Sequence, residues 1–134
     1  MDTQTSLVAT VAFTSSLWMF YVLNRFFRLG VGGTLANPRP DRPALSPWAQ
    51  RAKAAHANAV EGLVVFAPLV LVLMHLGLGN SRLATVAAMT YFGARVAHFV
   101  LYVAGVPGLR TVAFLVGYGA QLALVMAIFQ GGSK

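Results

Sequence analysis

Ionisable and hydrogen-bonding side chains recur at helical spacing in a chain that is otherwise strongly apolar. Tyr91, Arg95, His98 and Tyr102 follow one another at intervals of four, three and four residues. In an α-helix such intervals place side chains on one face, as a narrow polar stripe. A guanidinium flanked by an imidazole and two phenols on one face has the chemistry of an anion-binding site.

Two other segments carry polar residues at related spacing. Arg51, Asn58 and Glu61 fall within an arc of about 80° on a helix, whereas His56 points elsewhere. A third polar face is formed near the C-terminus by Arg110, Gly117 and Gln121. Several arginines grouped with the single acid Glu61 predict a site for an anionic ligand. If Glu61 holds an ammonium, the ligand is a zwitterion with more than one carboxylate.

Composition shows what kind of structure must position these residues. Of 134 residues, 57% are hydrophobic and 10% are charged, and the mean hydropathy is +0.69. Soluble domains carry about 25% charged residues, so the composition indicates a membrane protein. The chain has no cysteine, which excludes disulfides, thiolate metal sites and cysteine nucleophiles. A net charge of +7 accompanies no nucleic-acid-binding motif, and we expect no nucleic-acid partner.

The positions of the charged residues predict four membrane spans. Uncharged runs of 22, 20 and 23 residues separate Asp2 from Arg25, Glu61 from Arg82 and Arg110 from Lys134. A fourth run, 83–109, contains only Arg95 as an ion. Since a spanning helix needs about 20 apolar residues, we expect one all-α domain over 1–134, an up-down-up-down four-helix bundle. The predicted helices are about 5–29, 48–78, 82–105 and 108–130.

The distribution of basic residues predicts the orientation in the membrane. The Gly- and Pro-rich connection 30–47 is expected not to continue a helix, and Pro47 suits the first turn of the next one. Most basic residues flank this connection or open the last helix: Arg25, Arg28, Arg39, Arg42, Arg51, Lys53 and Arg110. Because such residues favour the cytoplasmic side, both termini are predicted to be periplasmic. The short loops favour a bacterial inner membrane.

Four motifs in order resemble the MAPEG superfamily of integral membrane glutathione transferases and eicosanoid synthases. They are Ala36-Asn37-Pro38, the run from Arg51 to Glu61 followed by VVFAPLVL, Ala94-Arg95-x-x-His98-x-x-x-Tyr102, and Arg110-Thr111 with Phe114-x-x-Gly117-Tyr118-Gly119. The resemblance covers nearly the whole chain. It implies a homotrimer that binds glutathione between neighbouring subunits near the cytoplasmic side.

The resemblance also implies roles for individual residues. Asn58 and Glu61 would grip the tripeptide with Arg95 and Tyr102, and Arg110 would hold the thiolate. The remaining residues of the predicted binding set are Arg28 (or Arg25), Arg51, His56 and His98. Many relatives carry Arg four residues before the Asn, where this chain has Ala54; Arg51 or Lys53 would have to substitute.

A guanidinium beside the sulfur lowers the pKa of a thiol from about 8.5 and raises the thiolate population. In agreement with this effect, the resemblance implies conjugation of glutathione to lipophilic electrophiles that partition into membrane lipid, or reduction of lipid hydroperoxides.

Several alternatives remain open on sequence alone. A non-catalytic membrane protein of the same fold, binding a lipid or a protein, is favoured by Ala54. A proton-coupled exporter would need an acid in the first span, which the chain lacks there. His56 and His98 could ligate haem. Structural roles are also open: an interhelical Asn58–Glu61 pair, an Arg95–Glu61 salt bridge, and Arg110 as an interface anchor.

Overall fold

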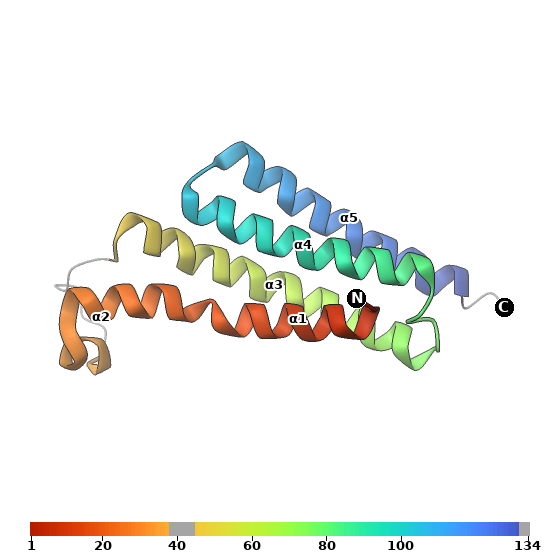
Figure 1. Cartoon of the computed structure of the whole chain (residues 1–134), viewed down its shortest axis with the longest axis horizontal. Helices are drawn as coiled ribbons and strands as arrows, with labels where there is room; N and C mark the ends of the chain where they lie inside the picture. Colours follow the sequence, from red (N-terminus) through yellow and green to blue (C-terminus); the bar gives the residue numbers. More distant parts are fainter. Residues whose placement is uncertain (38–44, 132–134) are drawn as a thin grey trace.

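Five helices make up the part of the chain that the computed structural model describes, residues 1–37 and 45–131. They are α1 (Thr3–Ser16), α2 (Trp18–Leu35), α3 (Pro47–His75), α4 (Arg82–Ala104) and α5 (Pro107–Gly131). Since α2 continues α1, the chain forms four rods that alternate in direction (Figure 1). All four are long and apolar enough to cross a membrane. The protein is therefore an all-α membrane protein built as a four-helix bundle.

The first rod is not one helix, as the sequence predicted for 5–29, but two. The break lies at Leu17, whose N–H bonds to Thr14 O at 3.3 Å, three residues back. Just before it, the Ser15 and Ser16 hydroxyls donate to the carbonyls of Ala12 and Phe13 at 3.0 and 2.8 Å. Serine hydroxyls that bond to carbonyls of the preceding turn bend helices, which explains a break without proline.

The prediction that the Gly-rich connection ends the helix at residue 30 was wrong. Gly30 interrupts the helix with φ 67° and ψ −177°, but helical structure resumes and reaches Leu35. Glycine permits this single left-handed residue without a Cβ clash. The positions Pro38, Arg39 and Arg42, used in the sequence argument, lie outside the described residues.

Local signals explain the ends of the other helices. Pro47 occupies the first turn of α3, where its missing N–H removes no helical bond. The Ser81 hydroxyl accepts a hydrogen bond from Ala84 N at the start of α4. Gly105, with φ 79°, ends α4 in the left-handed conformation that closes many helices. The α4–α5 connection is consequently a tight turn.

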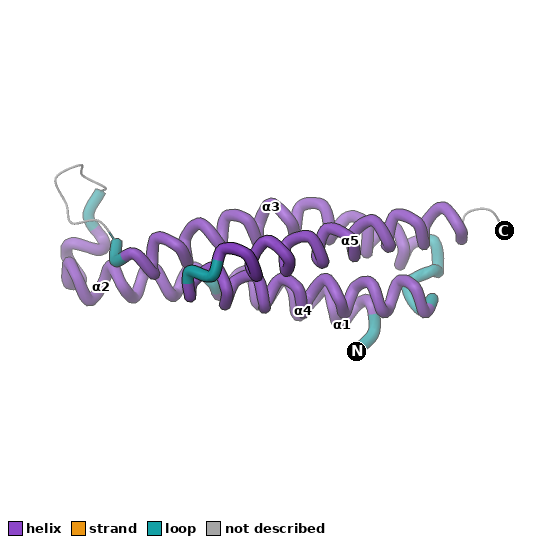
Figure 2. Tube along the Cα trace, turned by 90° about the horizontal axis from the view of Figure 1, so that it is seen from above, coloured by secondary structure: helices purple, strands orange, loops and turns teal. Residues whose placement is uncertain are grey.

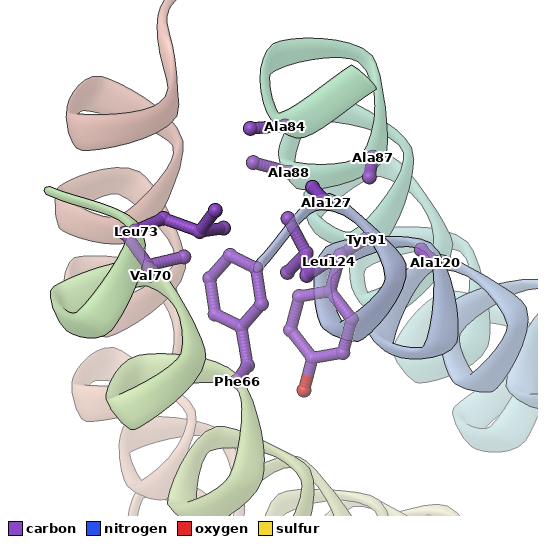
Figure 3. Packing of buried hydrophobic residues seen from close by; sticks show 10 residues of the cluster. All are labelled: Phe66, Val70, Leu73, Ala84, Ala87, Ala88, Tyr91, Ala120, Leu124 and Ala127. Carbon is purple, nitrogen blue, oxygen red and sulfur yellow. The ribbon is translucent and has the colours of Figure 1, made fainter. Parts of the chain in front are cut away.

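Small side chains and one aromatic stack form the main core. Phe66 of α3 and Tyr91 of α4 stack with ring centroids 4.0 Å apart and planes within 12° of parallel. Alanines of α4 and α5 surround them (Figure 3): Ala84, Ala87, Ala88, Ala120 and Ala127. Such residues allow membrane helices to approach closely. Large apolar side chains, such as Val64 at 69% exposure, cover the outer surface instead.

The other three rods are not spread evenly around α4. Figure 2 shows α3 and α5 along one side of the bundle and α1 and α4 along the other. The buried face of α1 is small and polar: Thr3, Ser6, Thr10 and Thr14. The Thr3 hydroxyl fixes it to the α3–α4 turn by donating to Gly79 O at 2.6 Å. Arg95 of α4 is thereby left facing α3 and α5.

Candidate functional site

A pocket of about 290 Å³ lies between α3 and α5, with α4 as its floor. Its walls combine polar and apolar side chains. The lining residues are Asn58, Glu61, Gly62, Val65, Tyr91, Arg95, Phe114, Tyr118 and Gln121. Three predicted site residues, Asn58, Glu61 and Arg95, therefore meet in one pocket. We call the end of the bundle where α3 begins and α4 turns into α5 the basic end.

Arg95 is the centre of this pocket. Its side chain is only 3% exposed. Nη1 donates to Asn58 Oδ1 at 3.2 Å and Nη2 to Phe114 O at 3.4 Å, while the buried Nε has no partner among the described residues. The guanidinium carbon lies 5.4 Å from the ring centroids of both Tyr91 and Phe114. The Arg95 guanidinium is thus surrounded by neutral hydrogen-bond acceptors and aromatic ring faces, which do not neutralise its charge.

Two glycines make room for the Arg95 side chain. A Cβ at Gly117 of α5 would lie 2.7 Å from Arg95 Nη2, and a Cβ at Gly62 of α3 would lie 3.3 Å from Nη1. The sequence placed Gly117 on the polar face of the last helix. The structure shows that the Arg95 side chain of α4 packs against it. Gly62 has the same function on the opposite wall.

Glu61 lies at the rim of the pocket and does not neutralise Arg95. Its side chain is exposed, and it forms no ion pair with the described part of the chain. The Arg95–Glu61 salt bridge considered as a structural alternative is therefore absent there. An unpaired cation in a low-dielectric site costs several kcal/mol. The pocket accordingly offers a buried positive charge and, separately, an accessible negative one.

The other predicted residues lie outside this pocket. Arg51 Nε donates to Val103 O at 2.9 Å, and its guanidinium packs against Gly105. It therefore satisfies a free carbonyl at the end of α4, as basic side chains near helix C-termini do. Arg110 lies over the ring of Tyr102, with its guanidinium carbon 4.3 Å from the centroid. Neither arginine borders the pocket.

Both histidines of the predicted set are held by neighbouring aromatic residues. His98 is 5% exposed, with its ring centroid 5.5 Å from that of Tyr102 and 6.1 Å from that of Phe114. His56 Nδ1 lies 3.1 Å from the Tyr21 hydroxyl, which joins α3 to α2. Arg28 is exposed. Of the arginines that were predicted to converge on one ligand, only Arg95 borders the pocket in the described chain.

Some pocket residues were not singled out by the sequence reasoning. Gly62 and Val65 continue the face of Asn58 and Glu61 at helical spacing, so the same periodicity could have identified them. Gln121 was assigned to a polar face; the structure adds that its Nε2 donates to Gly62 O at 2.9 Å. Tyr118, which the sequence reasoning named only as part of a motif, also borders the pocket.

The four spanning rods and the order of motifs agree with one family. The sequence model of the MAPEG family matches residues 5–130. The chain belongs to the MAPEG family. Comparison with curated protein sequences gave no match. Family membership and the four apolar rods together identify an integral membrane protein of this superfamily.

Proposed function

We propose that this MAPEG protein is a glutathione-dependent membrane enzyme, which conjugates the tripeptide to lipophilic electrophiles or uses it to reduce lipid hydroperoxides. The observation that carries the proposal is the Arg95 pocket, where a buried guanidinium with no acidic partner among residues 1–37 and 45–131 shares the lining with the accessible carboxylate of Glu61. Glutathione presents two carboxylates and one ammonium. The charges of the pocket complement these groups.

The size of the pocket supports a site shared between subunits. Small-molecule sites usually enclose roughly 300–1,000 Å³, and 290 Å³ lies just below that range. The rim residues Val65 and Tyr118 are exposed at 50% and 52%. In the proposed homotrimer a neighbouring subunit covers this rim and adds further contacts to the ligand. The predicted residues outside the pocket, Arg28 and Arg110, would act across such an interface.

The proposed chemistry needs an ionised sulfur and a nearby lipophile. A guanidinium beside the thiol lowers its pKa, so that more thiolate is present at neutral pH. Arg95 inside the pocket and Arg110 at the start of α5 are the two candidates for this role. The lipophilic substrate would reach the sulfur from membrane lipid, past the apolar rim. We place the basic end at the cytoplasmic face of a bacterial inner membrane.

A non-catalytic role is the second candidate, and Ala54 favours it. Ala54 does not border the Arg95 pocket. It lies with Leu45, Gln50, Lys53 and Ala57 along a separate, open hollow of about 570 Å³. A protein that binds only a lipid or a protein partner would keep the fold without glutathione turnover.

Calorimetric titration of the purified protein with glutathione tests the proposal. Wild type should bind, and Glu61→Gln should bind at least several-fold more weakly because the partner of the ligand's ammonium is lost. Asp2→Asn is the matched control, since it removes one negative charge beside Thr3, which bonds to Gly79 O in the α3–α4 turn, away from the pocket. Conjugation of chlorodinitrobenzene in detergent should be lost in Arg110→Ala if Arg110 holds the thiolate. Wild-type protein that neither binds nor turns over glutathione would favour the non-catalytic role.

A further inference from the structure

The open hollow along the first turns of α3 has no role in the proposed glutathione site. It encloses about 570 Å³, within the range of roughly 300–1,000 Å³ that is usual for small-molecule sites. Four of its lining residues recur at helical spacing and therefore share one face of α3, and a fifth precedes the helix: Gln50, Lys53, Ala54, Ala57 and Leu45. None of the five borders the Arg95 pocket. The hollow is therefore a separate feature of the surface.

Small apolar side chains and one cation line this hollow. Ala54 and Ala57 are exposed and leave open space beside the longer side chains of the same face. Gln50 is held in place, because its Nε2 donates to Leu45 O at 2.8 Å. Lys53 is exposed and forms no ion pair with the described part of the chain. Its ammonium group, with three N–H donors, is therefore available to a ligand that also contacts apolar surface.

The length of α3 places the hollow at the level of the lipid headgroups. The helix has 29 residues and is about 43 Å long, whereas the hydrocarbon layer of a membrane is about 30 Å thick. Its uncharged part begins after Glu61, so the excess of about 13 Å projects mainly at the basic end. Lys53 lies about 9 Å from the start of α3 and is then about 4 Å outside the hydrocarbon. Ala57 lies at the edge of that layer.

The charges around the hollow favour an anionic occupant. The end of α2 is fixed to the start of α3 by the bond from Asn24 to Ser46, so basic residues of three helices gather at the basic end: Arg25, Arg28, Arg51, Lys53 and Arg110. Of the acids among the described residues, Glu61 lies about two turns beyond Lys53 on α3, and Asp2 begins the chain. Basic residues next to a membrane span attract anionic lipids.

We propose that this hollow binds the headgroup of one anionic phospholipid. The Lys53 ammonium donates to oxygens of the lipid phosphate. The apolar Leu45, Ala54 and Ala57 contact the glycerol unit and the first carbons of the acyl chains, which continue alongside α3 into the hydrocarbon layer. Because the hollow and the Arg95 pocket share no lining residue, this inference goes beyond the proposed function and does not depend on glutathione binding.

The melting temperature of the delipidated protein in detergent, measured against added phosphatidylglycerol, tests the assignment. A ligand that binds the native state raises the melting temperature, so phosphatidylglycerol should stabilise wild type more than phosphatidylcholine does. Native mass spectrometry should show one phosphatidylglycerol retained per subunit. Lys53→Gln should need about 5-fold more phosphatidylglycerol for the same shift, as expected for one lysine at a membrane surface. Ala54→Leu keeps the charge but fills the hollow, and it should also reduce the shift.

Arg82→Gln is the matched control. It removes the same positive charge as Lys53→Gln, but from the first residue of α4, outside the hollow. Its response to phosphatidylglycerol should equal that of wild type. Because Lys53, Ala54 and Arg82 are all exposed, the three variants should melt close to wild type without added lipid, so that the lipid-dependent shifts can be compared directly.

Four results would overturn the lipid site. Equal loss of the shift in Lys53→Gln and Arg82→Gln would show attraction by net charge alone. Equal stabilisation by inorganic phosphate would show a site for a free anion. Weaker glutathione binding by Lys53→Gln, with an unchanged lipid response, would assign Lys53 to glutathione as the substitute for the arginine absent at Ala54. A changed oligomeric state in Ala54→Leu would assign the hollow to an interface between copies of the chain. Wild type that responds to phosphatidylglycerol as expected but binds no glutathione refutes only the proposed function.

Discussion

The contact between Gly117 and Arg95 allows a prediction with a defined sign and magnitude. Alanine in a helix interior is favoured over glycine by about 1 kcal/mol, so Gly117→Ala would stabilise the protein if nothing lay nearby. However, the new Cβ would be 2.7 Å from Arg95 Nη2 and 3.2 Å from Nε. The guanidinium must move away from α5. Its bonds to Phe114 O and Asn58 Oδ1, at 3.4 and 3.2 Å, are then lengthened or lost.

The net effect follows from these opposing terms. Hydrogen bonds made by charged groups contribute roughly 1.5–3 kcal/mol each, and bonds of these lengths belong at the lower end of that range. Losing one or both, against a gain of about 1 kcal/mol in helix propensity, gives a net destabilisation of about 0.5–2 kcal/mol. Glutathione affinity should also fall, because the displaced guanidinium intrudes on the pocket.

Unfolding in mixed micelles, followed by circular dichroism, measures the first effect, and calorimetry measures the second. Gly119→Ala is the matched control two residues along α5, since nothing lies within 4 Å of the Cβ it would add. It should be neutral or stabilising, with unchanged affinity. If Gly117→Ala were as stable as Gly119→Ala and bound glutathione equally well, the packing of Arg95 against α5 would be wrong.

Three further predictions concern residues outside the pocket. Arg51→Met should lower the free energy of unfolding by about 1 kcal/mol, because the hydrogen bond to Val103 O is lost. Calorimetry should show that it changes glutathione affinity less than Arg95→Met does. A larger effect of Arg51→Met than of Arg95→Met would place Arg51 in the ligand site. Asn24→Ala breaks a reciprocal pair of bonds with Ser46, at 2.9 and 3.0 Å, so amide exchange in the first turn of α3 should accelerate; unchanged exchange would contradict this. The hydrogen bond from the backbone N–H of Thr5 holds the pKa of the exposed Asp2 carboxyl below its ordinary value. The ionised carboxylate therefore stabilises the first turn of α1 at pH above the pKa of Asp2 in the unfolded chain. This stabilisation is lost as the pH falls through the pKa of Asp2 in the folded protein. Amide exchange there should rise on acidification in wild type and depend less on pH in Asp2→Asn, whose amide still caps the helix.

The sequence determined the architecture, because the membrane imposes it through composition and length. Runs of about 20 residues without charge are sufficient to predict spanning helices. The limits of α3, α4 and α5 lie near the predicted ones because Pro47, Ser81 and Gly105 are local end signals. The helix break at Leu17 was missed because it arises from serine hydroxyls bonding to carbonyls, which leaves hydropathy unchanged.

Periodicity also identified the face that carries the site, but not the partner of each side chain. Helical spacing placed Asn58, Glu61 and Arg95 on inward faces, and they meet in the pocket. It also grouped Arg51 with them. Only the tertiary structure could show that the end of α4 lies within reach of Arg51, whose long side chain bonds to a free carbonyl there instead. The spacing of residues within one helix determines the direction in which each side chain points. The packing of a second helix against the first determines which groups lie in that direction.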